Sequence, residues 1–424
     1  MPHTPNPQAA PEPDAGPRPG PLGLPRPVWL LGLTSLLTDT ASEAIYPLLP
    51  VYLTTVLGAG AMSLGLVEGV AEAANSLLKI ISGRVSDRWR VRRPIVIGGY
   101  GLSSLVRPLT ALITSWPQLL TVRLFDRIGK GVRGAPRDAM LAAYATPATR
   151  GRVYGFHRSM DHVGAIVGPL LASAFLLAWP GQYRWLFALT LVPGIMAVAS
   201  LFFVDEPEVA PEPAAAGGGG AKASLAWRKI PARLYALLGV ILVFTLGNSA
   251  DAFLLLRLSD AGVAAALIPL LWALLHVVKA VMSTWGGIVS DRMGRRLVIG
   301  AGWLVYALVY AGFAVSSSIG ALVAWLMVYG IYYGLSEGTE KALIADLAPA
   351  ALRGTAFGIY NAALGVGSLI ASVVFGVVWK LSSPAAAFGL GAALALLATV
   401  LLGVTRVTPP PAVGGQPSAG LRTL

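Results

Sequence analysis

The sequence predicts an all-α membrane protein with twelve transmembrane helices in two pseudo-symmetric bundles of six. The first observation is composition: 55% of the 424 residues are hydrophobic and only 12% are charged, whereas about a quarter of the residues in a soluble globular protein are charged. So little charge cannot cover a folded chain with a solvated surface. The second observation is a repeat, because the segment Gly83–Arg88 recurs as Gly287–Arg292, each time between two long apolar stretches.

Apolar stretches of bilayer length, about 20 residues each, fall into two sets of six. In the first half of the chain they are 28–54, 61–82, 94–115, 117–143, 150–178 and 184–204. In the second half they are 232–256, 262–285, 297–315, 320–347, 352–380 and 384–405. We therefore expect an N-terminal bundle over 28–204 and a C-terminal bundle over 232–405.

Three polar segments lie outside the predicted bundles. Residues 1–27 are rich in proline and carry no apolar run, so we expect a disordered tail without the pattern of a signal peptide. Runs of Pro, Ala and Gly make 205–231 typical of a flexible linker, and 406–424 form a second tail. Basic residues concentrate in the loops at 83–94 and 286–297. The positive-inside rule therefore places these loops, the linker and both termini in the cytosol, with the protein in a cell (inner) membrane.

The composition also excludes several kinds of site. The chain has no cysteine, which excludes disulfides, thiolate metal sites and cysteine nucleophiles. Its four histidines, His3, His157, His162 and His276, show no zinc-site spacing, and we expect neither a metal nor a cofactor. The net charge is +12, but most arginines sit in short loops between apolar spans, so we do not expect nucleic acid as a partner. No nucleophile–base arrangement indicates an enzyme.

The repeat extends beyond the two boxes, because residues 136–156 match residues 339–359. Two equivalent halves that bind a ligand at their interface, near the middle of the membrane, are typical of a transporter. The second box, Gly287–Arg296, and the first, with Gly83, Asp87 and Arg88, resemble the loop motif of the major facilitator superfamily. The first box has Arg90 where that family usually has glycine. The resemblance covers about residues 28–405 and implies transport by alternating access.

The fifth predicted helix carries a second pattern, formed by Gly155, Gly164, Gly168 and Pro169. It is similar to the motif of proton-coupled exporters in the superfamily, although Ala172 and Ser173 stand where that motif continues with glycines. Small residues at this spacing let helices pack closely, and proline can kink the helix. Ordinary close packing of helices is the alternative interpretation.

The fourth predicted helix carries an unusual stripe of charge. Its members recur at helical spacing and are Arg123, Asp126, Arg127, Lys130, Arg133 and Arg137, with Asp138 beside them. Charges at this depth cost several kcal/mol each unless they face water or a partner. One interpretation is a basic cavity wall that attracts an anionic substrate. The other is a buried ion-pair network with Asp39 and Glu43 of the first helix and Glu68 and Glu72 of the second.

The repeat also predicts a gate at the cytosolic side. Arg137 and Asp138 correspond to Glu340 and Lys341, with the two charges inverted. Opposite charges at equivalent positions favour pairing across the entrance, although the inversion can also arise by chance on solvated helix ends. The resemblance adds the box residues to the expected gate: Gly83, Asp87, Arg88, Gly287, Asp291 and Arg292.

Intramembrane polar residues supply the candidate transport site. The proton-coupling candidates are Asp39, Glu43 and Asp161. The candidates for the substrate path are Arg123, Arg127, Lys130, His157, Arg158, His276, Lys279, Tyr332 and Tyr333. In the family it resembles, the first, fourth, seventh and tenth helices line the cavity, which favours the residues of the first and fourth helices.

These observations predict a secondary active transporter that is most simply a monomer. Its partners would be a small-molecule substrate, protons and the lipid bilayer. The pattern of the fifth helix favours proton-coupled export of a small organic compound, as in bacterial proton-coupled antiporters. The basic stripe favours the alternative, a proton-coupled symporter that takes up an anionic metabolite. A membrane sensor without transport is a more distant alternative. Shared folds carry unrelated compounds, so the sequence does not identify the substrate.

Overall fold

The computed structural model describes residues 23–89, 92–145, 149–206, 230–349 and 352–405. These residues form helices and contain no strand, which confirms the predicted all-α class. The predicted tails at 1–27 and 406–424 and the predicted linker at 205–231 lie largely outside the described residues. The domain boundaries that depend on them stay a prediction.

The described residues of the N-terminal half form ten helical elements, several of which are segments of one span. They are α1 (Arg26–Ile45), η2 (Tyr46–Leu48), α2 (Leu49–Thr55), α3 (Ala61–Trp89), α4 (Arg93–Val106), η3 (Arg107–Leu112), α5 (Trp116–Ala143), α6 (Arg150–Ala178), α7 (Tyr183–Leu189) and α8 (Leu191–Leu201). Proline explains two of the interruptions, because Pro47 in η2 and Pro108 in η3 lack the N–H that would continue an α-helix.

The described part of the C-terminal half repeats this arrangement with fewer interruptions. Its helices are α10 (Ala232–Gly247), α11 (Ala252–Asp260), α12 (Ile268–Met293), α13 (Arg295–Val315), α14 (Ile319–Leu347), α15 (Arg353–Leu381) and α16 (Pro384–Val404). The predicted seventh span is divided at residues 248–251, between α10 and α11. Its polar break lies inside the protein and bears on the site described below.

Nine segments of the described residues are long and apolar enough to cross a membrane. The three remaining long stretches, 26–55, 61–89 and 116–143, are not among them. These stretches hold the acidic and basic residues singled out in the sequence, such as Asp39, Glu68 and Arg123. Charge therefore explains why a hydropathy criterion passes over them, and the count of twelve spans stays a prediction.

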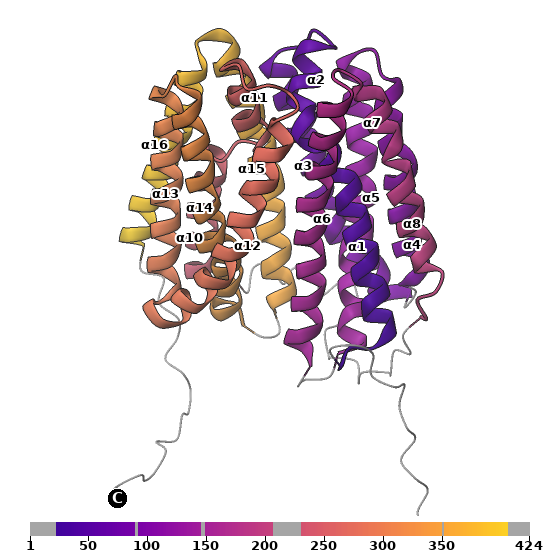
Figure 1. Ribbon diagram of the computed structural model, residues 1–424. Coiled ribbons are helices and arrows are strands. Elements are labelled where there is room, and N and C mark those ends of the chain that lie inside the picture. Colours follow the sequence, from indigo (N-terminus) through magenta and orange to yellow (C-terminus); the bar gives the residue numbers. More distant parts are fainter. Residues whose placement is uncertain (1–22, 90–91, 146–148, 207–229, 350–351, 406–424) are drawn as a thin grey trace, which may run out of the picture.

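The two halves stand side by side, with the indigo-to-magenta helices of the first next to the orange-to-yellow helices of the second (Figure 1). We call the end where α3 and α12 finish the box face, because Gly83–Arg88 and Gly287–Arg292 lie there (lower end in Figure 1), and the opposite end the far face. The halves meet where α3 crosses α15 and where α6 crosses α12. Glycine makes the first crossing close, since a Cβ atom on Gly65 would overlap the backbone of Ser372.

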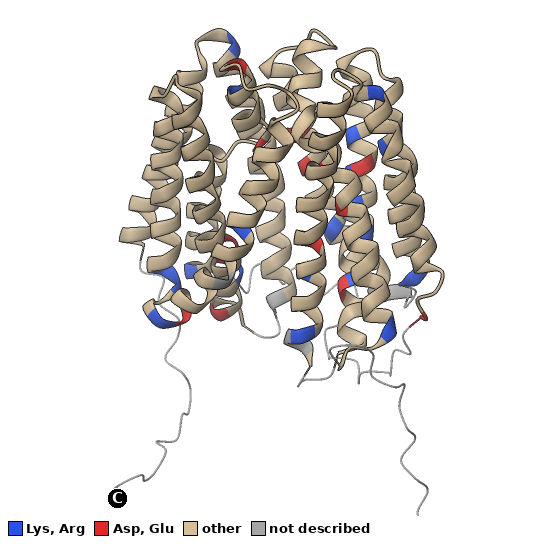
Figure 2. Ribbon diagram, in the orientation of Figure 1, with Lys and Arg blue, Asp and Glu red and all other residues tan. Residues whose placement is uncertain are grey.

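Charge is distributed unequally between the halves. Figure 2 shows Lys, Arg, Asp and Glu at several heights inside the N-terminal half. In the C-terminal half, the largest fully buried side chains are aromatic, with Trp303, Tyr306, Tyr310 and Tyr329 among them. The N-terminal half therefore depends more on buried ion pairs, and the C-terminal half depends more on aromatic packing.

Candidate transport site

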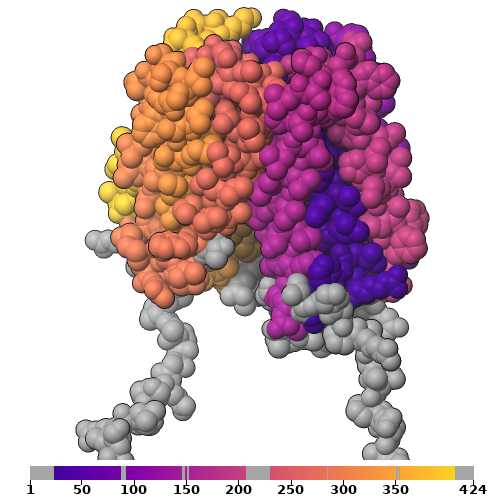
Figure 3. Space-filling model, viewed as in Figure 1, coloured from indigo at the N-terminus to yellow at the C-terminus, as the bar shows by residue number. Residues whose placement is uncertain are grey.

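A cavity of about 1230 Å³ lies between the two halves. Its wall includes residues 79–84 of α3, 130–138 of α5 and 354–362 of α15, and these segments lie toward the box face. The space-filling view shows the halves in contact along a boundary that is hollowed at its lower end (Figure 3). The cavity therefore opens at the box face.

Contacts between the halves close the opposite end of the cavity. The Trp272 indole Nε1 donates a hydrogen bond to Glu43 Oε2 at 2.9 Å. The same indole packs against the ring of Tyr46 with 5.2 Å between centroids. Further along, Ser173 Oγ donates to the carbonyl of Ala266 at 2.6 Å. A cavity that is open at one face and closed at the other is the arrangement that alternating access requires of one of its states.

We expect Trp272→Phe to shift the molecule toward a state open at the far face. The ring contact with Tyr46 is kept, but the N–H donor to the Glu43 carboxylate is lost, and hydrogen bonds to charged groups contribute about 1.5–3 kcal/mol. The shift in population should therefore be roughly tenfold or more. Because the chain has no native cysteine, Ser283→Cys provides a single label site on the cavity wall.

The measurement is the rate at which a membrane-impermeant maleimide added at the box face modifies that cysteine. Trp272→Phe should slow the labelling, whereas Trp285→Phe on the same helix, with 66% of the residue exposed, should leave the rate unchanged. Equal rates in both variants would show that the Glu43 contact does not hold the far face closed.

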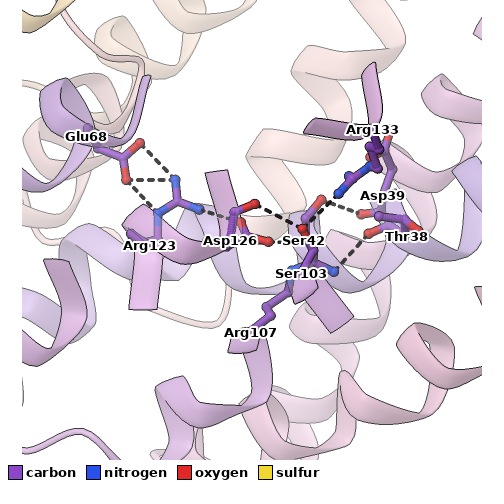
Figure 4. A network of polar contacts seen from close by, with 9 residues as sticks. All are labelled: Thr38, Asp39, Ser42, Glu68, Ser103, Arg107, Arg123, Asp126 and Arg133. Carbon is purple, nitrogen blue, oxygen red and sulfur yellow. Dashed lines mark hydrogen bonds and ion pairs between the residues drawn. The ribbon is translucent and has the colours of Figure 1, made fainter. Parts of the chain in front are cut away.

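The outer part of the charged stripe on α5 forms a buried ion-pair network (Figure 4). Arg123 binds Glu68 of α3 through Nε and one terminal nitrogen of its guanidinium, the Nη2–Oε1 distance being 2.8 Å and the Nε–Oε1 distance 3.1 Å. Its Nη1 lies 3.6 Å from Asp126 Oδ2. Asp126 in turn accepts from Arg107 of η3 at 2.9 Å. These residues do not line the cavity, so the buried-network interpretation describes this part of the stripe.

The inner part of the stripe faces the cavity, as the other interpretation expected. Lys130, Arg133 and Arg137 belong to the cavity wall. Arg133 is anchored, since its Nη1 donates to Ser103 Oγ at 2.8 Å and its guanidinium lies 4.2 Å from the centroid of the Tyr100 ring. Arg127 is half-buried outside the cavity wall, and its Nε has no hydrogen-bond partner among the described residues.

The three proton-coupling candidates all line the cavity but differ in their partners. Glu43 accepts from Trp272, as described above. Asp161 accepts a short hydrogen bond from Ser35 and lies 3.7 Å from His157 Nδ1 and 3.8 Å from Arg158 Nη1. The Asp39 carboxylate forms neither a hydrogen bond nor an ion pair with any side chain that the structure describes. Asp39 is thus the one of these three carboxylates that has no described side-chain partner.

The two histidine candidates have different environments. His157 is buried, with 4% of the residue exposed, and does not belong to the cavity wall. His276 lines the cavity and packs edge-on against Trp272 with 4.8 Å between ring centroids. Arg158 also lines the cavity and joins the halves, because its Nη2 lies 3.2 Å from Glu337 Oε1 of α14.

Lys279 of α12 is the basic residue that the C-terminal half presents deepest in the cavity, within an aromatic cage. Its ammonium lies 3.2 Å from Asp251 Oδ2 and 3.7 Å from the centroid of the Tyr333 ring. The ring of Trp272 covers it from another side at 4.9 Å. Both Lys279 and Tyr333 belong to the cavity wall. A cation in this position gains from both the carboxylate and the aromatic faces.

Tyrosine side chains supply hydrogen-bond partners to the polar groups at the break between α10 and α11. Tyr306 donates to the carbonyl of Gly247 at 3.0 Å, and Asn248 donates to the hydroxyl of Tyr332 at 3.1 Å. Asp251 accepts from Tyr329 at 2.7 Å and from Tyr333 at 3.0 Å. Irregular backbone in a membrane persists only where such partners replace the helical bonds. Tyr332 therefore supports the broken helix and, unlike Tyr333, does not line the cavity.

Among the expected gate residues whose side chains the structure describes, none pairs across the entrance. Arg137 binds its neighbour Asp138 at 2.8 Å, and Lys341 binds Glu337 at 3.0 Å. Glu340 is buried away from the cavity and accepts from Trp303 Nε1 at 2.9 Å and from the hydroxyl of Tyr360 at 3.3 Å. An entrance that is open separates the two sets of residues. Pairing in the closed state stays a prediction for Arg137, Asp138 and Lys341, and the observed partners of Glu340 give it a packing role here.

The two boxes differ in how much of them the structure describes. The side chains of Asp87 and Arg88 lie outside the described part. Asp291 lies 3.4 Å from Arg295, which also binds Asp346 of α14 at 2.5 Å, and Arg292 is exposed. Close helix packing beside the second box comes from Gly286, the residue that precedes it, where a Cβ would overlap the backbone of Gly334. Gly287 has open space, and Gly83 would meet only Ala135 at ordinary contact distance.

The glycine pattern of α6 separates into packing and non-packing positions. A Cβ on Gly164 would overlap the backbone of Leu36, and one on Gly168 would overlap the backbone of Thr40. Both contacts are with α1. A Cβ on Gly155 would meet no atom within 4 Å, and Pro169 lies inside the helix. Gly164 and Gly168 therefore fix the crossing that places Asp39 of α1 near Asp161 of α6.

An arginine after each box binds the last helix of its own half. Arg93 Nη2 donates to the carbonyl of Phe202, just beyond α8, at 2.7 Å. Arg296 Nε donates to the carbonyl of Leu402 at 2.8 Å and its Nη2 to that of Gly403 at 2.5 Å, both in α16. Carbonyls at a helix C-terminus lack intrahelical donors, so these arginines cap them.

Sequence reasoning missed several members of the site. Lys79 lines the cavity from α3, and Arg107 holds Asp126 from η3. Each is the single basic residue of its predicted membrane span, and this was the available signal. Within the part of the chain that the structure covers, no group of three or more His, Cys, Asp or Glu side chains could hold a metal ion.

Comparisons with known proteins agree with this arrangement. The model of the Major Facilitator Superfamily matches residues 31–282 and 237–423. An uncharacterized MFS-type transporter of Methanocaldococcus jannaschii is 34% identical over 385 residues, which cover 89% of this chain and 94% of that protein. Multidrug resistance protein MdtH of Aeromonas hydrophila is 26% identical over 173 residues, which cover 41% of this chain and 42% of that protein.

Solved transporters share the fold at low sequence identity. The nucleoside transporter NupG superposes with a TM-score of 0.71 at 14% identity, covering 90% of this chain and 98% of that one. A D-xylose–proton symporter superposes with a TM-score of 0.68 at 17% identity, covering 90% of this chain and 99% of that one. The family match, the helical fold and the cavity that opens at one face lead to one conclusion: the chain belongs to the major facilitator superfamily, whose members are multi-pass membrane transporters and not enzymes.

Proposed function

We propose that this transporter exports a small organic compound in exchange for protons. In this proposal the box face lies at the cytosol of a cell (inner) membrane, because the basic loops are there. The structure then corresponds to the state that admits substrate from the cytosol. The partial likeness to a multidrug resistance protein supports export over import.

The observation that carries proton coupling is the unpartnered carboxylate of Asp39. It lines the cavity together with Asp161 and Lys130, and it has no ion pair among the described side chains. A carboxylate in such a place is neutral or charged according to what shares the cavity with it. Its position on α1, against the close crossing with α6, allows a change of charge to act on the packing of the two helices.

Asp39→Asn is expected to abolish pH-driven transport. In inside-out membrane vesicles with an acidic lumen, the wild-type protein should concentrate a fluorescent organic probe inside. Fluorescein and ethidium serve as the anionic and the cationic probe. Without a proton-binding carboxylate, the proton gradient cannot drive transport. The variant should therefore accumulate no more probe than vesicles that lack the protein.

Asp260→Asn is the matched control, because Asp260 is an exposed aspartate at the end of α11, outside the cavity. It should transport like the wild type. Retention of gradient-driven transport by Asp39→Asn would rule out Asp39 as the proton carrier. Absence of gradient-driven transport in the wild type with both probes, and with a wider panel, would contradict proton-coupled export.

A second candidate function is the symport of an anionic metabolite. The cavity wall favours it, because basic residues outnumber acidic ones. The basic residues are Lys79, Arg84, Lys130, Arg133, Arg137, Arg158, Lys279 and Lys341, and the acidic residues are Asp39, Glu43, Asp138, Asp161 and Glu337. The same vesicles distinguish the two directions, since an exchanger moves the probe toward the acidic side and a symporter moves it away from that side.

A further inference from the structure

Three lysines converge on the box-facing part of the cavity from both halves of the molecule. Lys79 comes from α3, Lys130 from α5 and Lys341 from α14, and all three belong to the cavity wall. We call them the lysine triad. Lys79 experiences the charges of both other members, as well as that of Arg137. The triad therefore concentrates like charge across the boundary between the halves.

The carboxylates that attract Lys79 and Lys130, among them Asp39 and Glu43 near Lys130, form no direct ion pair with these two lysines. Neither Lys79 nor Lys130 has a described carboxylate within the 4.0 Å of an ion pair. The Glu72 carboxylate, which attracts Lys79 most strongly, accepts instead from Asn75 at 3.0 Å and Ser76 at 3.4 Å. Lys341 shares Glu337 with Arg158, so one carboxylate faces two cations.

Cations without counter-ions are costly in a site walled by protein, and buried ones are normally paired. Two buried cations of this molecule follow the rule, since Arg123 has Glu68 and Lys279 has Asp251. We propose that the lysine triad is the binding site for a small anion with two or more negative charges, of the polycarboxylate or phosphate-ester class. This inference rests on the proposed transport function only where it treats the anion as the transported substrate.

The placement of the triad also gives the anion an effect on conformation. Lys79 and Lys341 belong to different halves and repel one another while the entrance is open. A bound anion that contacts both replaces this repulsion with two attractions and draws α3 toward α14. Binding thus favours closure of the box face, which is the step that must follow loading of the cavity.

The test is anion binding to the purified full-length protein in detergent, followed by thermal unfolding at constant ionic strength. Pyrophosphate and citrate are the probes, chloride is the reference, and tetraethylammonium tests the opposite charge. Both anions, or one of them, should raise the midpoint of unfolding with a saturable dependence on concentration, because a ligand that binds the native state stabilises it. The cation should have no effect.

Lys79→Gln and Lys130→Gln should each weaken the binding by about tenfold or more, the loss expected for one charge-assisted hydrogen bond. Lys130→Arg should restore much of it. Lys380→Gln is the control, because Lys380 is an exposed lysine at the end of α15, outside the cavity. The inference is overturned if neither anion stabilises beyond chloride, if tetraethylammonium stabilises instead, or if Lys380→Gln weakens binding as much as Lys79→Gln does. The assay needs no proton gradient, so saturable binding without gradient-driven transport would contradict the proposed exchange and leave the anion site standing.

Discussion

Arg123→Ala is expected to lower the free energy of unfolding by about 3–5 kcal/mol, the typical loss when one partner of a buried ion pair is removed. Arg123 and Glu68 have side chains that are 7% and 6% exposed. After the substitution, the Glu68 carboxylate would remain buried with no cation, and Asp126 would lose one of its two. The measurement is chemical unfolding in mixed micelles, followed by tryptophan fluorescence.

The double variant Glu68→Gln/Arg123→Gln tests whether the loss of stability comes from the buried charge that is left without a partner. It should be clearly less destabilised than the sum of its two single variants, since no uncompensated charge remains. Arg158→Ala is the control, because the Arg158 side chain is 56% exposed and its pair with Glu337 is solvated. Exposed pairs contribute at most about 1 kcal/mol. Equal losses for Arg123→Ala and Arg158→Ala would show that burial does not determine the energy of these pairs.

Gly168→Ala and Gly155→Ala are expected to change stability in opposite directions, although both glycines belong to the same sequence pattern. A methyl group on Gly168 would overlap the Thr40 carbonyl, so α1 and α6 would have to separate. Overpacking of this kind costs about 1–3 kcal/mol. A methyl group on Gly155 meets nothing within 4 Å. There the substitution gains the helix propensity of alanine, about 0.5–1 kcal/mol.

Unfolding of the two variants under the same conditions gives the comparison directly. Transport should follow packing, since displacement of α1 moves Asp39 relative to Asp161. Gly168→Ala should therefore lose gradient-driven transport, and Gly155→Ala should keep it. If both substitutions prove neutral, the α1–α6 crossing is looser than the structure describes. If both destabilise equally, the pattern acts as a unit rather than through its individual contacts.

The helical class and the family could be predicted from the sequence because both depend on features spread along the whole chain. Apolar length, loop charge and the repeated box are present in many residues at once, and no single contact decides them. The structure and the comparisons confirm the all-α class and the superfamily. The periodicity of residues 123–137 likewise indicated one charged face on one helix.

Glu68 was one of the acids expected opposite that face, and it pairs with Arg123. The other pairings could not be predicted, because helical spacing tells which residues share a face and not what lies opposite. Both interpretations of the stripe describe part of it, and the division falls between Arg123 and Lys130, where the wall of the cavity begins. The prediction of the gate was limited for the same reason. The repeat made Glu340 equivalent to Arg137, but equivalence of position does not fix the direction of a side chain, and Glu340 turns toward Trp303.

The glycine pattern shows a related limit. A motif read from the sequence treats Gly155, Gly164 and Gly168 alike, whereas only the last two meet the backbone of α1. Which glycine is essential depends on where two helices cross. That crossing is set by tertiary packing and leaves no separate mark in the spacing.

The arginine caps after the two boxes have a consequence for how the protein is made. Arg93 holds the end of α8 and Arg296 holds the end of α16, so each cap joins the second loop of its half to its last helix. The cap of the first half needs no residue beyond Phe202. A nascent chain can therefore complete this contact of its N-terminal half in the bilayer before the C-terminal half has been synthesised. Membrane insertion then proceeds in two similar steps, one for each half. Each step ends when the last helix of the half reaches the arginine that was synthesised earlier in the same half.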